Sequence, residues 1–338
     1  MQNFCVIPWY SQELDLRSGV ETVCCWIDED ISRHQLQQQF LSGQRPSQCQ
    51  RCWQSESQGI ESRRQMENRF LDFKMNRDLE FLAHDVAQGQ SHINMYQLFL
   101  GSTCNGACVT CGPESSSLWR SLQKRTVSIR SENTAVDDRW QNFCSTVDWT
   151  AAKRFNLLGG EPLLLDKSFD VLQKLLQAGN TDCRVSFVTN GSVTPNKHQR
   201  ELFKQFTDIS CCVSIDGIGS VYEYLRYPLS WSAMEKNLAV YQEIFSEVVV
   251  NVTISNLNYH LREEIVAWLQ KMQLKHFETY VSDPPWFNCE VTPEHALWPR
   301  FVQEIQTQDN IKQINIEDYM PDIAQLIQES TTVQHKML

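Results

Sequence analysis

Residues 101 to 113 read GSTCNGACVTCGP, a short segment that carries Cys104, Cys108 and Cys111. A structural zinc site or a closed cubane cluster takes four protein ligands, so three thiolates leave one coordination position open. An open position predicts a site where chemistry takes place. A zinc loop with a distant fourth ligand is the alternative reading of the same spacing.

The composition predicts a cytoplasmic protein with a sizeable core. The chain has 338 residues, of which 41% are hydrophobic, as is ordinary for globular proteins. The start lacks the basic segment of a signal peptide, and no apolar stretch is long enough to cross a bilayer. A formal charge of -11 argues against extended contacts with nucleic acid. In a reducing compartment, 13 cysteines are more often metal or cluster ligands than disulfides.

Beyond residue 76, short apolar runs alternate with segments of helical periodicity. Because strands that alternate with helices form parallel β/α units, the pattern predicts an α/β fold, a partial (β/α)6 barrel of parallel strands. Its active site is expected at the carboxyl ends of the strands. The six predicted strands are residues 95–100, 154–158, 184–189, 211–215, 248–254 and 277–281.

Three domains are expected along the chain. Residues 1–75 are rich in Gln, Ser, Trp and Cys and show little periodicity. They predict a small, loop-rich N-terminal domain held together by a metal or an iron-sulfur cluster. Residues 76–290 form the barrel, and residues 291–338 form a C-terminal helical segment.

The segment CNGACVTC resembles the CxxxCxxC signature of the radical S-adenosylmethionine superfamily, with Thr110 where that family usually has an aromatic residue. The resemblance covers roughly residues 92 to 285. It implies that Cys104, Cys108 and Cys111 hold a [4Fe-4S] cluster whose fourth iron binds S-adenosylmethionine.

Further motifs follow the second, third and fourth predicted strands, namely LLGGEP, FVTNG and VSIDG. The resemblance implies that the first motif meets the amino group of S-adenosylmethionine and that the other two lie near its ribose. Arg226, in EYLRYP, is a candidate for binding a carboxylate of the cofactor or of the substrate, with a surface role as the alternative. The candidate cofactor contacts are therefore Gly159, Gly160, Glu161, Asn190, Ser214, Asp216 and Arg226.

A second set of cysteines lies near the N-terminus. Cys5, Gly19 and Cys24 are separated by 13 and 4 residues, which resembles the first element of the SPASM and twitch auxiliary-cluster domains. With the CxxC pair Cys49 and Cys52, this implies one auxiliary [4Fe-4S] cluster, in a domain that known families usually carry after the barrel. Cys25 is an alternative ligand to Cys24, and a four-cysteine zinc knuckle is an alternative site.

The resemblance implies an enzyme that reductively cleaves S-adenosylmethionine to a 5'-deoxyadenosyl radical, which abstracts hydrogen from an unactivated C-H bond. Modification of a ribosomally made peptide is the expected reaction, and chemistry on a small metabolite, sugar or nucleoside is the alternative. A non-catalytic iron-sulfur or zinc interaction protein is a further alternative. The expected partner is a reducing protein such as flavodoxin or ferredoxin, which the basic residues Arg120, Lys124, Arg125 and Arg130 could dock.

Overall fold

The structure, a computed structural model, describes residues 3–27, 31–76, 78–123 and 129–336. The chain divides into two compact units. The first unit comprises residues 1–100, 131–157 and 170–185, and the second unit comprises residues 101–130, 158–169 and 186–338. Every one of the radical S-adenosylmethionine candidate residues lies in the second unit, and the four N-terminal cysteines lie in the first.

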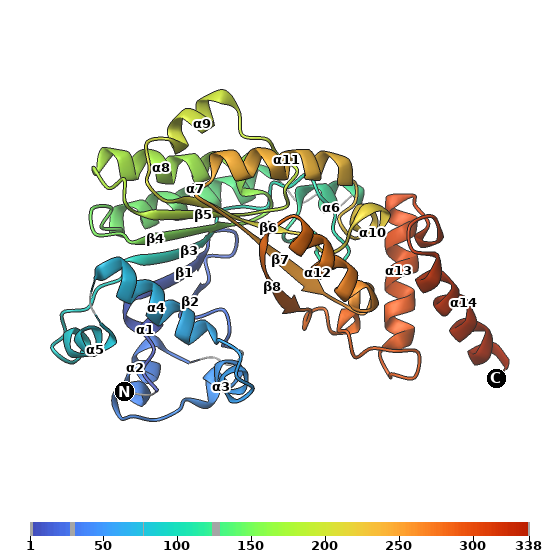
Figure 1. The fold of residues 1–338 in the computed structure, drawn as a ribbon, viewed down its shortest axis with the longest axis horizontal. Coiled ribbons are helices and arrows are strands. Elements are labelled where there is room, and N and C mark those ends of the chain that lie inside the picture. Colours follow the sequence, from blue (N-terminus) through green and yellow to red (C-terminus); the bar gives the residue numbers. More distant parts are fainter. Residues whose placement is uncertain (1–2, 28–30, 77, 124–128, 337–338) are drawn as a thin grey trace. The chain divides into compact units, whose positions relative to one another are not determined.

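The six strands predicted from the sequence are present, and the mixed α/β fold with a parallel sheet is confirmed (Figure 1). The strand order is β2-β1-β3-β4-β5-β6-β7-β8. In the second unit, β6 pairs in parallel with β7, and β7 with β8, in the registers Ser210 to Glu247 and Val249 to Lys275. The predicted strands are β3 (Met95–Phe99), β4 (Arg154–Leu158), β5 (Arg184–Thr189), β6 (Ile209–Ser214), β7 (Glu247–Ile254) and β8 (Lys275–Tyr280).

Helices follow these strands, and the 3.6-residue periodicity of the sequence predicts four of them. After β3 come α6 (Ser117–Leu122) and α7 (Ile129–Thr146), and after β4 come η2 (Pro162–Leu164) and α8 (Asp166–Gln177). The later helices are α9 (Lys197–Phe203), α10 (Gly219–Leu225), α11 (Trp231–Ile244), η3 (Tyr259–Leu261), α12 (Arg262–Lys271) and η4 (Pro285–Phe287). The four predicted helices are α8, α9, α11 and α12. Among the described residues, no helix combines the length and the apolar character that crossing a membrane requires.

The N-terminal region holds more regular structure than its sequence pattern predicts. β1 (Ser11–Asp15) pairs in parallel with β3 and antiparallel with the short β2 (Glu21–Thr22). Reciprocal side-chain caps at Ser32 and Ser62 start two of the helices, as the S-x-x-Q spacing favours. The helices are α1 (Ile7–Tyr10), α2 (Arg33–Leu41), η1 (Ser47–Cys49), α3 (Gln50–Ser57), α4 (Arg63–Met75) and α5 (Leu79–Ala87).

This region also has a core of its own. Val6, Tyr10, Leu36, Leu71 and Leu82 are almost fully buried in one hydrophobic cluster. These side chains come from the residue before α1 and from α1, α2, α4 and α5. The core becomes apparent only when the elements are packed together.

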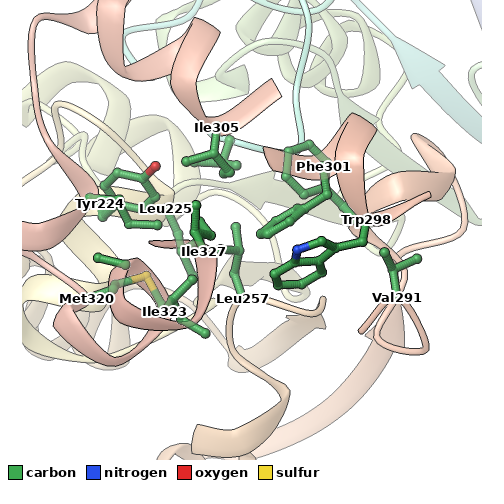
Figure 2. Close-up of a cluster of buried hydrophobic side chains, with 14 of the residues drawn as sticks. Tyr224, Leu225, Leu257, Val291, Trp298, Phe301, Ile305, Met320, Ile323 and Ile327 are labelled. Atoms are coloured by element: carbon green, nitrogen blue, oxygen red, sulfur yellow. The ribbon is translucent and has the colours of Figure 1, made fainter. Parts of the chain in front are cut away.

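The C-terminal segment packs within the second unit through a hydrophobic cluster between α13 (Trp298–Lys312) and α14 (Pro321–Lys336), which lie side by side (Figures 1 and 2). The turn η5 (Ile316–Asp318) joins them. Trp298 donates from Nε1 to Ser330 Oγ at 2.9 Å. Val109, from the cysteine loop, belongs to the same cluster. The C-terminal helices are therefore part of the structure that supports that loop.

Candidate iron-sulfur sites

The cysteine loop follows β3 and buries the residues between its cysteines more fully than the cysteines themselves. Ala107 and Val109 are 0% and 1% exposed, whereas Cys104 and Cys108 are half-buried and Cys111 is exposed. A methyl group placed on Gly106 would lie 3.5 Å from Cys108 Sγ and 3.8 Å from Cys104 Sγ. These two thiols therefore flank the same glycine.

Backbone and side-chain hydrogen bonds hold the loop from several elements. Ser116 Oγ donates to the Gly106 carbonyl at 2.6 Å, and Trp119 Nε1 donates to the Cys108 carbonyl at 2.9 Å. The Val109 amide donates to the Leu225 carbonyl at 2.8 Å. Because the backbone is fixed on several sides, the loop holds the three cysteines in defined positions.

The paired glycines after β4 pack against the start of this loop. Gly160 N donates to the Gly101 carbonyl, and Glu161 N donates to the Thr103 carbonyl, both at 2.8 Å. A Cβ on Gly159 would lie 2.7 Å from Gly101 O, and one on Gly160 would lie 2.3 Å from Thr103 O. The structure thus gives both glycines a role in holding the loop, in the place where the sequence predicts contact with a ligand.

Glu161 is fully buried, and its carboxylate joins two strand ends. Its Oε1 accepts from Thr189 Oγ1 at 2.8 Å, and its Oε2 accepts from Asn190 N at 2.8 Å. Burial raises the pKa of Glu161, and these hydrogen bonds oppose that shift. Asn190 in turn donates from Nδ2 to Asn105 Oδ1 at 3.0 Å and lies 3.9 Å from Cys104 Sγ. Glu161 and Asn190 therefore meet beside Cys104.

Asp216 and Arg226 are paired with each other. Arg226 Nη2 lies 2.7 Å from Asp216 Oδ2, and both side chains are buried. Burial lowers the pKa of Arg226, but Asp216 and the Cys108 thiol raise it, and the net shift is upward. Nε of Arg226 has no hydrogen-bond partner among the described residues. Ser214 is half-buried at the end of β6.

The three thiols are a suitable donor set for a cluster that binds thiolates. Burial raises the pKa of Cys104 to about 11 and that of Cys111 to about 12, and it also raises the pKa of Cys108. The Cys108 thiol further raises the pKa of Cys104 and that of Cys111, because like charges repel. The three thiols therefore lie within electrostatic reach of each other. Binding as thiolates therefore releases protons.

Within the described ranges, no three His, Cys, Asp or Glu side chains are grouped as ligands of one metal ion.

In the first unit, the four N-terminal cysteines line one small cavity of about 20 Å³. Cys5 precedes α1, Cys24 follows β2, and the remaining two lie on η1 and α3. Burial raises the pKa of both Cys24 and Cys49 to about 12. The other cavity residues are mostly apolar, so thiols are the main donors there; the lining is Cys5, Ile7, Pro8, Cys24, Ile27, Leu36, Phe40, Cys49, Cys52 and Arg64.

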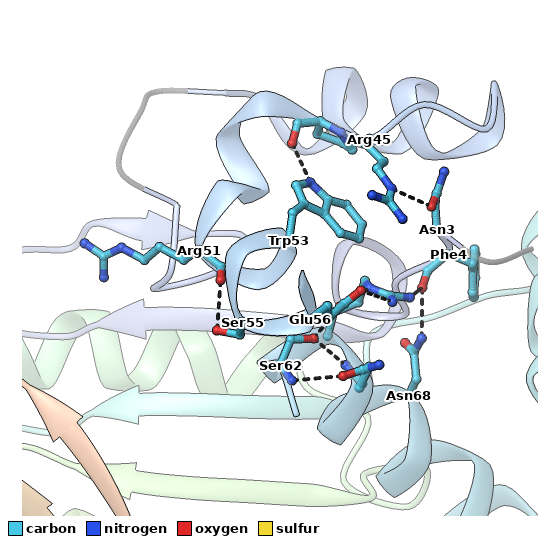
Figure 3. Close-up of polar contacts among 12 residues, drawn as sticks. Asn3, Phe4, Arg45, Arg51, Trp53, Ser55, Glu56, Ser62 and Asn68 are labelled. Carbon is cyan, nitrogen blue, oxygen red and sulfur yellow. Dashed lines mark hydrogen bonds and ion pairs between the residues drawn. The ribbon is translucent and has the colours of Figure 1, made fainter. Parts of the chain in front are cut away.

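Polar contacts fix the segments that carry these cysteines (Figure 3). Asn68 accepts from the Val6 amide at 2.9 Å and donates to the Phe4 carbonyl at 2.8 Å, so it holds the backbone on both sides of Cys5. Trp53 Nε1 donates to the Pro46 carbonyl at 2.9 Å, across the turn that contains Cys49 and Cys52. The cavity is therefore framed by the protein itself.

Cys24 and Cys25 face different surroundings. Cys24 lines the cavity, whereas Cys25 Sγ contacts the Arg63 guanidinium. Arg63 is buried and also pairs with Glu13 and Glu67. This buried charge network, which extends from Glu67 to Arg154, is not predicted from the sequence.

The remaining sequence prediction in this region concerns the basic segment. Lys124 and Arg125 lie outside the described residues. Arg120 does not point to solvent alone, because it donates to the Pro113 carbonyl at 3.0 Å and to Ser102 Oγ at 2.6 Å. It therefore braces the cysteine loop.

The sequence prediction also missed two residues of α13, one that donates to the cysteine loop and one that lies over Trp119 of α6. Gln308 Nε2 donates to the Val109 carbonyl at 2.9 Å, and Lys312 Nζ lies 4.8 Å from the Trp119 ring centroid. Both continue a stripe at spacings of three and four residues that begins with apolar side chains, the buried positions being Trp298, Phe301, Ile305, Gln308 and Lys312. Polar residues that continue an apolar stripe are a signal that could have identified them.

No protein-family model matches the sequence, and no curated protein matches it. Among solved structures, the chain is similar to SuiB of Streptococcus suis bound to precursor peptide SuiA, with a TM-score of 0.42 and 13% identity over 69% of this chain. The match spans 50% of the SuiB chain. It is also similar to anSMEcpe with bound AdoMet and Cp18Cys peptide, with a TM-score of 0.43 and 15% identity, covering 64% of this chain and 58% of that one.

Proposed function

We propose that this protein is a radical S-adenosylmethionine enzyme. The observation that carries the proposal is the meeting of three thiols with Glu161 and Asn190 at the carboxyl ends of consecutive parallel strands. Cys104, Cys108 and Cys111 would hold a [4Fe-4S] cluster. When bound, the cluster and S-adenosylmethionine supply the electron transfer and bond cleavage that give a 5'-deoxyadenosyl radical.

The residues of the chain position and shield this site. Gly159 and Gly160 hold the cysteine loop against β4, and Asn190 approaches Cys104. The buried Nε–H of Arg226 has no hydrogen-bond partner among the described residues. The proposal assigns this donor to a carboxylate of the cofactor or substrate. Asp216 keeps the guanidinium in place. These groups would orient a polar cofactor next to the open iron.

The four-thiol cavity is proposed to hold an auxiliary [4Fe-4S] cluster, as the SPASM and twitch resemblance implies. Cys5, Cys24, Cys49 and Cys52 supply four thiolates, which leave no exchangeable position. The surrounding side chains are apolar, which keeps water away from the thiolates.

The proposed substrate is a peptide, which follows from the resemblance of the N-terminal cysteines to twitch enzymes. A reduced flavodoxin or ferredoxin would supply the electron. The reaction is hydrogen abstraction from an unactivated C-H bond of the peptide, in which the deoxyadenosyl radical becomes 5'-deoxyadenosine and the peptide becomes a carbon radical.

The test starts with protein purified without oxygen, for the wild type and for a Cys104→Ala, Cys108→Ala, Cys111→Ala triple variant. Iron, sulfide and zinc are measured, and 5'-deoxyadenosine is assayed after dithionite and S-adenosylmethionine are added. The expected result is about eight irons per chain in the wild type and about four in the variant, with cleavage abolished. A zinc-filled wild type, or clusters that never cleave the cofactor, would refute the proposal.

A further inference from the structure

Lys312 is a buried cation whose placement calls for an explanation. It lies on the inner face of α13 and is 3% exposed. Removing an ammonium group from water is unfavourable unless other groups compensate for the lost hydration. A neutral side chain would continue the apolar stripe of the helix without that cost.

The ammonium group is held in an aromatic box. Nζ lies 4.8 Å from the Trp119 ring centroid and 6.0 Å from those of Tyr224 and Tyr227. It donates to Gln308 Oε1 at 3.0 Å. Aromatic faces attract cations and leave the net charge in place, whereas a carboxylate partner would cancel it.

Two of these partners are themselves bonded to the cysteine loop. Trp119 donates to the Cys108 carbonyl, and Gln308 donates to the Val109 carbonyl, each at 2.9 Å. The box is therefore fixed to the backbone between Cys108 and Cys111. The ammonium group is therefore held at a fixed position relative to the backbone that carries these two thiols.

Two carboxylates lie near Lys312, those of Asp309 and Glu304. Burial lowers the pKa of Lys312 to about 8, and nearby acidic groups oppose that shift. Asp309 is already engaged, because its carboxylate accepts from the Tyr224 hydroxyl and from the Ile316 amide, both at 2.9 Å. Glu304 accepts from Gln308 Nε2 at 3.1 Å, so both carboxylates bind other donors.

We propose that Lys312 is a positioning residue that holds a positive charge beside Cys108 and Cys111 and thereby raises the reduction potential of the cluster. The inference rests on the proposed function, because it needs a cluster on these thiols. Adding one electron makes the cluster more negative, and a nearby buried cation stabilises that state. The cation also offsets part of the negative charge that several thiolates bring into this apolar loop.

The test compares reduction potentials of oxygen-free protein with reconstituted clusters. Samples are poised with dithionite and mediators, and the EPR signal of the reduced cluster is recorded. The relevant signal is the one that changes when S-adenosylmethionine is added, which separates it from the auxiliary cluster. The variants are Lys312→Met, Lys312→Gln and Lys312→Arg. Lys174→Met is the matched control, because Lys174 Nζ also lies over a tryptophan, 5.8 Å from Trp149.

Both neutral variants are expected to be harder to reduce, by at least tenfold in the equilibrium constant, which is about 59 mV for one electron. Lys312→Arg and Lys174→Met are expected to stay close to the wild type. If the neutral variants lose iron while Lys312→Arg retains it, the charge is needed to hold the cluster, which also supports the inference. An unchanged potential in Lys312→Met and Lys312→Gln, or loss of iron in all three Lys312 variants, overturns it. Absence of any S-adenosylmethionine-sensitive cluster in the wild type overturns the proposed function instead.

Discussion

Gly160 lies so close to Thr103 that a Cβ on the glycine would come within 2.3 Å of the Thr103 carbonyl oxygen. The carbonyl belongs to the backbone that leads into Cys104, and the next residue, Glu161, donates its amide to the same oxygen. The motif after β4 and the cysteine loop therefore depend on each other for their positions.

Gly160→Ala is expected to destabilise the second unit and to lower iron incorporation. The added methyl group meets backbone, which cannot move aside cheaply, so a loss of about 2–3 kcal/mol is expected. Urea unfolding of the metal-free protein measures it. Gly219→Ala is the control, because nothing lies within 4 Å of its Cβ position and only its positive φ of 57° adds strain, about 1 kcal/mol. Equal losses in the two variants would contradict the steric argument.

Cys24→Ser and Cys25→Ser form a matched pair at adjacent positions. Cys24 lines the four-thiol cavity and Cys25 faces Arg63. Cys24→Ser is expected to lose the metal of the first unit, whereas Cys25→Ser is expected to retain it. Iron, sulfide and zinc contents per chain are the measurement. Retention by Cys24→Ser together with loss by Cys25→Ser would assign the ligand role to Cys25.

Metal binding at the four-thiol cavity is expected to strengthen as the pH rises. Burial raises the pKa of Cys24 and Cys49 to about 12, and the pKa values of Cys5 and Cys52 are also raised. All four thiols are then protonated near neutral pH, so each must lose its proton to bind. The apparent affinity for a probe ion such as Zn²⁺ should rise about tenfold per pH unit for each proton released.

Competition titrations with a chromophoric chelator, on metal-free protein at a series of pH values, measure this slope. Cys24→Ser removes one of the four titrating thiols and should make the slope shallower by about one proton. An affinity that does not change with pH would show that the thiols are already ionised, contrary to their burial.

Glu13→Gln is expected to destabilise the first unit. The Arg63–Glu13 ion pair has side chains that are 10% and 2% exposed, and removing the carboxylate leaves a buried guanidinium with Glu67 as its remaining acidic partner. The expected loss in the free energy of unfolding is about 3 kcal/mol. Chemical unfolding followed by tryptophan fluorescence measures it.

Glu61→Gln is the control for this variant. Its partner Arg69 is 69% exposed and Glu61 itself is 41% exposed, so the loss should be less than about 1 kcal/mol. A Glu13→Gln variant that is as stable as Glu61→Gln would mean that the buried network contributes nothing net to folding.

The sequence by itself determined six strands of the sheet, their alternation with helices and the placement of the cysteine loop after the first of these six. These features depend on local periodicity and on short spacings, which can be read directly from the sequence. Glu161 and Asn190 became candidates through the resemblance of LLGGEP and FVTNG, which lie after β4 and β5, to motifs of the superfamily.

Only the tertiary structure decided the relations between distant residues. It pairs β1 with β3, turns Cys24 and not its neighbour towards the four-thiol cavity, and brings Gln308 to Val109 of the cysteine loop, 199 positions earlier in the chain. Asp216 and Arg226, expected to reach a ligand, are paired with each other. Such contacts arise when whole elements pack, so they depend on many side chains together and leave no short spacing in the sequence.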